Sequence, residues 1–148
     1  MKFFILFALL YTATAYARTP IAQYSWQNQV ASSQVFIFDD GEIQHQERHQ
    51  YQVDTIDEAP LTETELRGVK DLINDVTESS VSSQLTPASV GSYSGVIEVQ
   101  TNEGMKIIEG VVRDGSNLKQ AKAYRSFSPA TDKLKNFFFR YANRDMEF

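Results

Sequence analysis

A capping box at Thr62 is the feature that most constrains the fold, because it fixes where a helix begins. The Thr62 hydroxyl can accept a hydrogen bond from the backbone of Glu65, and the Glu65 carboxylate can accept one from the backbone of Thr62. Apolar residues then recur at helical spacing, at Leu66, Val69, Leu72, Ile73 and Val76. The pattern predicts a helix over 62–77. Because Gly68 weakens this helix by ~1 kcal/mol relative to alanine, the helix must pack against a sheet.

A second helix is predicted near the end of the chain. Ser128 suits the N-cap and Pro129 suits the first helical position. The apolar face of this helix comprises Leu134, Phe137, Phe138 and Tyr141. Residues 118–127, just before it, fit a short helix and an edge strand equally poorly. Residues 78–92 contain six serines, which predicts a long loop, either a mobile connector or a binding loop.

Two stretches rich in β-branched and aromatic residues predict antiparallel hairpins. Residues 33–53 contain the turn Asp39-Asp40-Gly41, in which the glycine can adopt a positive φ. Residues 93–113 contain a second turn at 102–104. Together with the helices, the hairpins predict an α+β fold in the order ββα-ββ(x)α. We expect an antiparallel sheet of about four strands with two helices packed on one face.

The chain has the length of a single domain. We expect this α+β domain to span residues 33–142, followed by a frayed tail at 143–148. Residues 18–32 are polar with scattered aromatic side chains. They are expected to form either a loose N-terminal segment or an edge strand around Tyr24 and Trp26.

Residues 1–17 have the pattern of a cleavable export signal. Lys2 provides a positive start, the apolar run over 3–11 is too short to span a bilayer, and Ala15 and Ala17 form an A-x-A cleavage motif. An uncleaved anchor is the alternative. The chain contains no cysteine, whereas small exported eukaryotic domains usually carry disulfides. We therefore expect a bacterial protein, periplasmic or secreted, with no integral membrane segment after cleavage.

No catalytic, cofactor or metal site is predicted. His45, Glu47 and His49 share one face if they lie on a strand, but the two histidines are then ~13 Å apart, too far for one zinc ion. We expect this face to be a polar, solvent-facing sheet edge. Carboxylate pairs such as Asp57 and Glu58 fall in a predicted loop, where they are expected to be solvated. The serines match no nucleophile motif, and the glycines match no nucleotide-binding fingerprint.

Charge is unevenly distributed along the chain. The formal net charge of −5 argues against binding to nucleic acid. Residues 39–103 carry three basic and fourteen acidic side chains, whereas residues 106–148 carry nine basic and five acidic ones. If the two stretches occupy different surfaces, the resulting dipole suits the steering of a protein partner. If they are intermixed, the charges serve only solvation.

Recognition usually involves loops held by a rigid sheet. We therefore expect a protein partner to contact the predicted loop at 78–92 or the two hairpin turns. The candidate contact residues are Asp39, Asp40, Gly41, Ser82, Ser83, Gln84, Asn102 and Glu103.

The order of elements resembles that of emfourin-like proteins, which are small bacterial inhibitors of thermolysin-type metallopeptidases. The corresponding stretches are Gln34 to Val53, Leu61 to Val76, Tyr93 to Val112, and Asp132 to Tyr141. The resemblance implies that the partner is a metallopeptidase. Because the Gly-Gly-aromatic signature of that family is not at the first strand here, no inhibitor residue is carried over.

These observations favour an exported, non-catalytic domain that binds another protein and has no cofactor. Peptidase inhibition is the sharpest form of this hypothesis. Two alternatives remain: a small exported hydrolase with an unrecognised site, and an envelope-associated structural module.

We predict that the exported protein begins at Arg18. Because signal peptidase requires small residues at the A-x-A positions, Ala17→Arg should block cleavage and retain the chain in the membrane fraction. Intact-mass spectrometry of the exported and membrane fractions measures both outcomes. An exported chain that still begins at Met1 would contradict the prediction.

Overall fold

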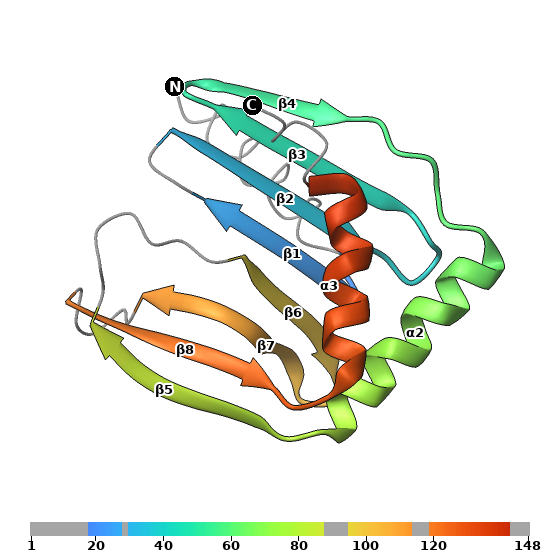
Figure 1. The fold of residues 1–148 in the computed structure, drawn as a ribbon. Coiled ribbons are helices and arrows are strands. Elements are labelled where there is room, and N and C mark those ends of the chain that lie inside the picture. The colour runs from blue at the N-terminus through green and yellow to red at the C-terminus, as the bar shows by residue number, and fades with distance from the viewer. Residues whose placement is uncertain (1–17, 28–29, 88–94, 114–118, 143–148) are drawn as a thin grey trace, which may run out of the picture.

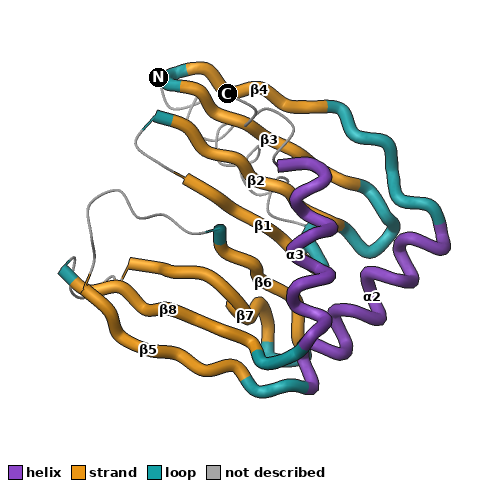
Figure 2. Tube along the Cα trace, viewed as in Figure 1, coloured by secondary structure: helices purple, strands orange, loops and turns teal. Residues whose placement is uncertain are grey.

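Two runs of four strands, each followed by a helix, make up the part of the chain described by the computed structural model, residues 18–27, 30–87, 95–113 and 119–142 (Figures 1 and 2). The first run is β1 (Ala22–Gln27), β2 (Ala31–Ile37), β3 (Ile43–His49), β4 (Gln52–Ile56) and α2 (Glu63–Glu78). The second run is β5 (Val81–Pro87), β6 (Val96–Thr101), β7 (Gly104–Arg113), β8 (Gln120–Ser126) and α3 (Pro129–Ala142). The predicted export signal and frayed tail lie outside the described residues. Neither of the described helices is long and apolar enough to cross a membrane.

The strands form one eight-stranded sheet in the order β4-β3-β2-β1-β6-β7-β8-β5, and the neighbouring strands pair antiparallel. The prediction of about four strands is therefore wrong, although the chain still combines a sheet with helices as an α+β protein. The two halves meet where β1 pairs with β6, with Tyr24 opposite Ile97. β1 thus lies at the centre of the sheet, where residues 18–32 were expected to give a loose segment or an edge strand.

Sequence periodicity misses β4, which a local turn creates, and it misses β5 and β8, which contacts distant in sequence determine. The stretch expected as one strand breaks at Gln50, which has a positive φ of 55°, and β4 folds back on β3. β5 lies within the serine-rich stretch expected as a loop, and β8 lies within the ambiguous residues 118–127. These two strands pair with each other along their whole length. Their weak intrinsic propensity is outweighed by this pairing.

Both helices begin where their capping residues predict. The Thr62 hydroxyl accepts from the backbone N–H of Glu65 at 3.2 Å, and the Glu65 carboxylate accepts from the backbone N–H of Thr62 at 2.9 Å. This backbone hydrogen bond from Thr62 is the main reason that the pKa of Glu65 is lowered. Before α3, the Ser128 hydroxyl accepts from the N–H of Ala130 at 3.2 Å. The predicted capping box and the predicted N-cap at Ser128 are therefore confirmed.

Both helices lie on one face of the sheet, with α3 crossing its centre (Figure 1). The Tyr24 ring of β1 stacks on Phe138 at 5.8 Å between centroids and meets Phe139 edge-on at 5.8 Å. Burial at this position raises the pKa of Tyr24. Phe138 is fully buried, and the core continues beneath α2 with Val69, Ile73 and Val76. The core therefore joins both helices to the central strands.

Gly110 of β7, close to a β-bulge between β6 and β7, has no room for a side chain. The register between these strands shifts between Ile97 and Glu98. Gly110 has a φ of +120°, and a Cβ added there would lie 2.7 Å from the carbonyl oxygen of Gly95 and 2.8 Å from the Cα of Val96. Both neighbouring atoms belong to the backbone, so no side-chain rotation can relieve the clash.

Alanine substitutions at two glycines should have opposite effects on stability. In α2, a Cβ added at Gly68 meets nothing within 4 Å. Gly68→Ala should therefore stabilise the protein by ~1 kcal/mol through helix propensity. Gly110→Ala should destabilise it by ~3 kcal/mol or more, because backbone strain adds to a backbone clash. Urea titration of both variants measures the difference, and equal effects would contradict the close backbone approach assigned at Gly110.

Candidate functional site

The residues predicted to contact a partner lie in two separate places. The turn at 39–41 joins β2 to β3, and the turn at 102–103 joins β6 to β7. Because β2 and β6 both flank β1 and run antiparallel to it, these turns lie at the same end of the sheet (Figure 1). Ser82, Ser83 and Gln84 lie instead in the edge strand β5, where all three are exposed. The predicted residues therefore do not form one surface.

The turn between β2 and β3 is used within the fold itself. The Asp40 carboxylate accepts from the backbone N–H of Glu42 at 3.0 Å, and Arg18 forms ion pairs with Asp40 and Glu42. The hydrogen bond from Glu42 is the main reason that the pKa of Asp40 is lowered. The Nζ of Lys70 in α2 lies 2.8 Å from the carboxylate of Asp39. These contacts hold the turn against the N-terminal segment and α2.

A polar cluster is buried between β2, β3 and the loop after β4. His45 lies at its centre and is 1% exposed. Its Nδ1 is 3.0 Å from a carboxylate oxygen of Glu58, and its Nε2 is 3.1 Å from one of Glu47. The hydroxyl of Ser33 lies 3.4 Å from the same Nε2. The side chains of Glu47 and Glu58 are only 7% and 6% exposed. We call these four residues the His45 cluster.

This burial corrects two expectations from the sequence. The expectation of a solvent-facing sheet edge around His45 and Glu47 is wrong, because both residues are buried and the edge strand next to β3 is β4. Glu58 is likewise not solvated. One signal was available: His45 and Glu47 alternate in step with Ile43, which is buried in the core. No spacing rule connects His45 with Glu58, since the latter comes from a loop beyond the next strand.

The His45 cluster contains the residue types of a Ser-His-Glu triad but lacks a free base. The histidine of such a triad must present an unprotonated nitrogen to the serine. Here the Nε2 that faces Ser33 lies closer to the Glu47 carboxylate. Both ring nitrogens of His45 thus lie against carboxylates, so neither is left to activate Ser33. Because Ser33 is also only 5% exposed, the arrangement suits a buried ion-pair network.

The two histidines occupy different environments on the same strand. Both lie on β3, as their alternation predicts. His49 has a side chain that is 59% exposed, and its Nε2 lies 3.5 Å from the second carboxylate oxygen of Glu47. Among the described residues, no group of three or more histidine, aspartate or glutamate side chains is arranged to hold a metal ion.

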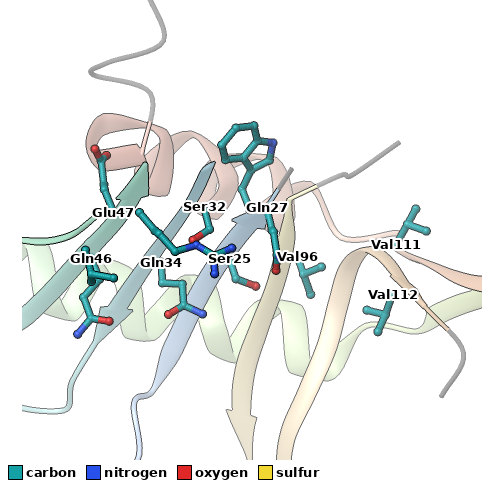
Figure 3. Close-up of a pocket in the computed structure, with 12 residues that line it drawn as sticks. Ser25, Gln27, Ser32, Gln34, Gln46, Glu47, Val96, Val111 and Val112 are labelled. Atoms are coloured by element: carbon teal, nitrogen blue, oxygen red, sulfur yellow. The ribbon is translucent and has the colours of Figure 1, made fainter. Parts of the chain in front are cut away.

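The face of the sheet opposite the helices is not covered by any described element (Figure 1). Across its middle, Gln46 of β3 lies opposite Gln34 of β2, and Gln34 lies opposite Ser25 of β1. These three side chains point to the same side of the sheet, whereas Glu47 points to the other (Figure 3). We call this surface the uncovered face. It presents neutral hydrogen-bonding groups on rigid strands.

A hollow of about 560 Å³ opens on the uncovered face where the two halves of the sheet meet. Arg48 lines it from the first half of the chain, whereas the Trp26 side chain, which alternates with that of Ser25, packs against the core on the helix side. The other walls of the hollow include the amides described above and three valines of the second half, Val96, Val111 and Val112. The Nε of Arg48 is buried and has no hydrogen-bond partner among the described residues. The hollow therefore combines apolar walls with a cationic side chain.

A second hollow, of about 870 Å³, lies on the helix side between α3 and strands β6 to β8. Lys135 and Glu109 line it and pair with each other at 3.2 Å. One oxygen of Glu109 and the hydroxyl of Thr131 are buried and have no hydrogen-bond partner in the described part of the chain. Because the charged side chains of this hollow already pair with each other, it is the weaker candidate.

No family model, curated protein or solved structure matches the chain. The uncovered face, its hollow and the His45 cluster therefore provide the basis for inferring a function.

The two histidines should differ sharply in their contribution to stability. His45→Leu removes the imidazole that contacts the two buried carboxylates of Glu47 and Glu58, which should cost ~3–5 kcal/mol. His49→Leu removes an exposed contact and should cost less than ~1 kcal/mol. Urea unfolding at neutral pH compares the two variants. Similar costs would contradict the assignment of His45 as the centre of a buried network.

Proposed function

We propose that this chain is an exported, non-catalytic domain that binds another protein through the uncovered face. Strands hold the side chains of that face in place, so binding costs little conformational entropy. Exposed side-chain amides at Gln34, Gln44 and Gln46 can both donate to and accept from the backbone of a partner. Because they are neutral, they lose less on desolvation than charged side chains would.

The hollow beside Arg48 is the observation that carries the proposal. Its volume of about 560 Å³ lies within the ~300–1,000 Å³ typical of binding pockets. Arginine is one of the residue types that most often dominate the binding energy of protein interfaces. The valine walls suit an apolar side chain of the partner, while Arg48 suits a neighbouring carbonyl or carboxylate. The hollow would then anchor the partner at the centre of the interface.

The alternatives are less well supported. A hydrolase would need a base free to activate a nucleophile, and the geometry of the His45 cluster occupies both ring nitrogens with carboxylates. An envelope-associated structural module is not favoured by any feature of the described residues. We therefore retain protein binding as the function.

Peptidase inhibition is the finer form of the proposal. Its support is the export signal predicted over 1–17. The observed order, four strands and a helix in each half, differs from the order on which the resemblance to emfourin-like inhibitors is based. Such an inhibitor would bind its peptidase stoichiometrically and would turn over no substrate. The hairpin turns at 39–41 and 102–103 stay predicted contact sites for that partner.

Arg48→Met should weaken partner binding without weakening the fold. The substitution keeps the apolar stem and removes the donors, and the Nε that it removes has no partner among the described residues. A loss of ~2 kcal/mol, typical of an interface hot spot, would raise the dissociation constant about 30-fold. The partner is first isolated from periplasm and medium with the wild-type chain as bait, and is then titrated with each variant. Arg67→Met, at an exposed position on α2, is the matched control.

Two outcomes would contradict parts of the proposal. Equal binding by the Arg48→Met and wild-type chains would exclude the hollow as the anchor. Turnover of any substrate by the purified protein would exclude a non-catalytic role. Titration against thermolysin and against co-exported metallopeptidases tests the finer form, which requires inhibition that is complete at one chain per enzyme.

A further inference from the structure

The two edges of the sheet differ in how well they are protected against pairing with another strand. β4 and β5 are the edge strands, and each presents alternate backbone N–H and C=O groups with no neighbour in the sheet (Figure 1). β4 has only five residues, and it carries the exposed charge of Asp54. Short length and charge are the usual means by which proteins protect an edge.

β5 lacks both forms of protection. It has seven residues, Val81–Pro87, and none of them is charged. Ser82, Ser83, Gln84 and Leu85 are exposed, and the Leu85 side chain is 58% exposed. A long, uncharged and exposed edge strand is a template for the addition of another strand.

The strand next to β5 indicates which charge the added strand should carry. β8 contributes Lys122 opposite Leu85 and Arg125 opposite Ser82, and both basic side chains are exposed. Neither β5 nor β8 contains an acidic residue. Strands lie ~4.8 Å apart, so an added strand would be ~10 Å from β8, within reach of long lysine and arginine side chains that extend across β5. The surface beside the β5 edge is therefore basic.

We propose that β5 binds an extended, acidic segment of a partner protein by strand addition. Backbone hydrogen bonds to β5 would supply affinity, and the basic side chains of β8 would supply the preference for acidic residues. Lys122 and Arg125 are three positions apart and so lie on opposite faces of the sheet. The segment should therefore carry two acidic residues spaced three apart, opposite Leu85 and Ser82, with an apolar residue two positions from the first and diagonal to Leu85.

A second copy of this chain is a poorer occupant of the same edge. Pairing β5 with β5 of another copy would surround the joint with Lys122 and Arg125 from both chains. Like charges at such close range disfavour the pairing. Arg48 lies on β3, near the opposite edge of the sheet from β5. The inference about β5 therefore does not depend on the anchor proposed at Arg48.

Two heptapeptides test the proposal on the full-length mature protein. The probe is acetyl-Val-Thr-Glu-Val-Thr-Glu-Val-amide, and its control replaces both glutamates by glutamine. We expect the acidic peptide to shift the backbone amide signals of β5 in ¹⁵N NMR spectra and to bind about tenfold more tightly than the control. This difference should shrink at high salt, because exposed charges are screened.

Charge variants locate the source of the preference. Lys122→Gln combined with Arg125→Gln should remove the roughly tenfold preference for the acidic peptide. Lys106→Gln in β7, also at an exposed position, should leave it unchanged. The proposal is overturned if neither peptide binds at millimolar concentration, if both bind equally, or if the shifts map to β4 or to the uncovered face. Self-association through β5 in sedimentation experiments would overturn it as well.

Discussion

The packing of Tyr24 against α3 is the interaction on which the rest of the structure depends. Tyr24 lies on β1, which pairs with β2 on one side and with β6 on the other. α3 comes from the second half of the chain, yet it packs on β2 of the first half. Phe138 and Phe139 bring its aromatic face onto the Tyr24 ring, so that one helix spans the joint between the two halves. The sheet is thereby held as one unit of eight strands.

This arrangement also determines where recognition can occur. With both helices committed to one face, the opposite face and the two edges remain for contacts with other molecules. Gln34 and Gln46 make the middle of the uncovered face polar and neutral, while Arg48 provides an anchor at its hollow. The charges that would protect an edge strand are absent from β5. The neighbouring strand β8 supplies basic side chains instead. Both proposed surfaces therefore suit a protein partner, with different chemistry.

Local signals could be predicted from the sequence, and contacts distant in sequence could not. Thr62 and Ser128 mark helix starts because each cap acts within three residues, and both are confirmed. β5 and β8 could not be predicted, since each becomes a strand only by pairing with the other across some 40 residues of chain. The His45 cluster was missed for the same reason, because Glu58 reaches His45 from a loop. Ser82, Ser83 and Gln84 stay predicted contact residues, now placed on an edge strand.

A double-mutant cycle between Tyr24→Ala and Phe138→Ala tests the central claim most directly. Phe138 is fully buried, so Phe138→Ala alone should cost ~3–5 kcal/mol in the free energy of unfolding. The stacked rings should also show a coupling energy of ~1 kcal/mol beyond the two separate losses. Urea titration of the wild type, both single variants and the double variant provides these values. Additive losses, or a small cost for Phe138→Ala, would contradict the claim that α3 joins the two halves through these rings.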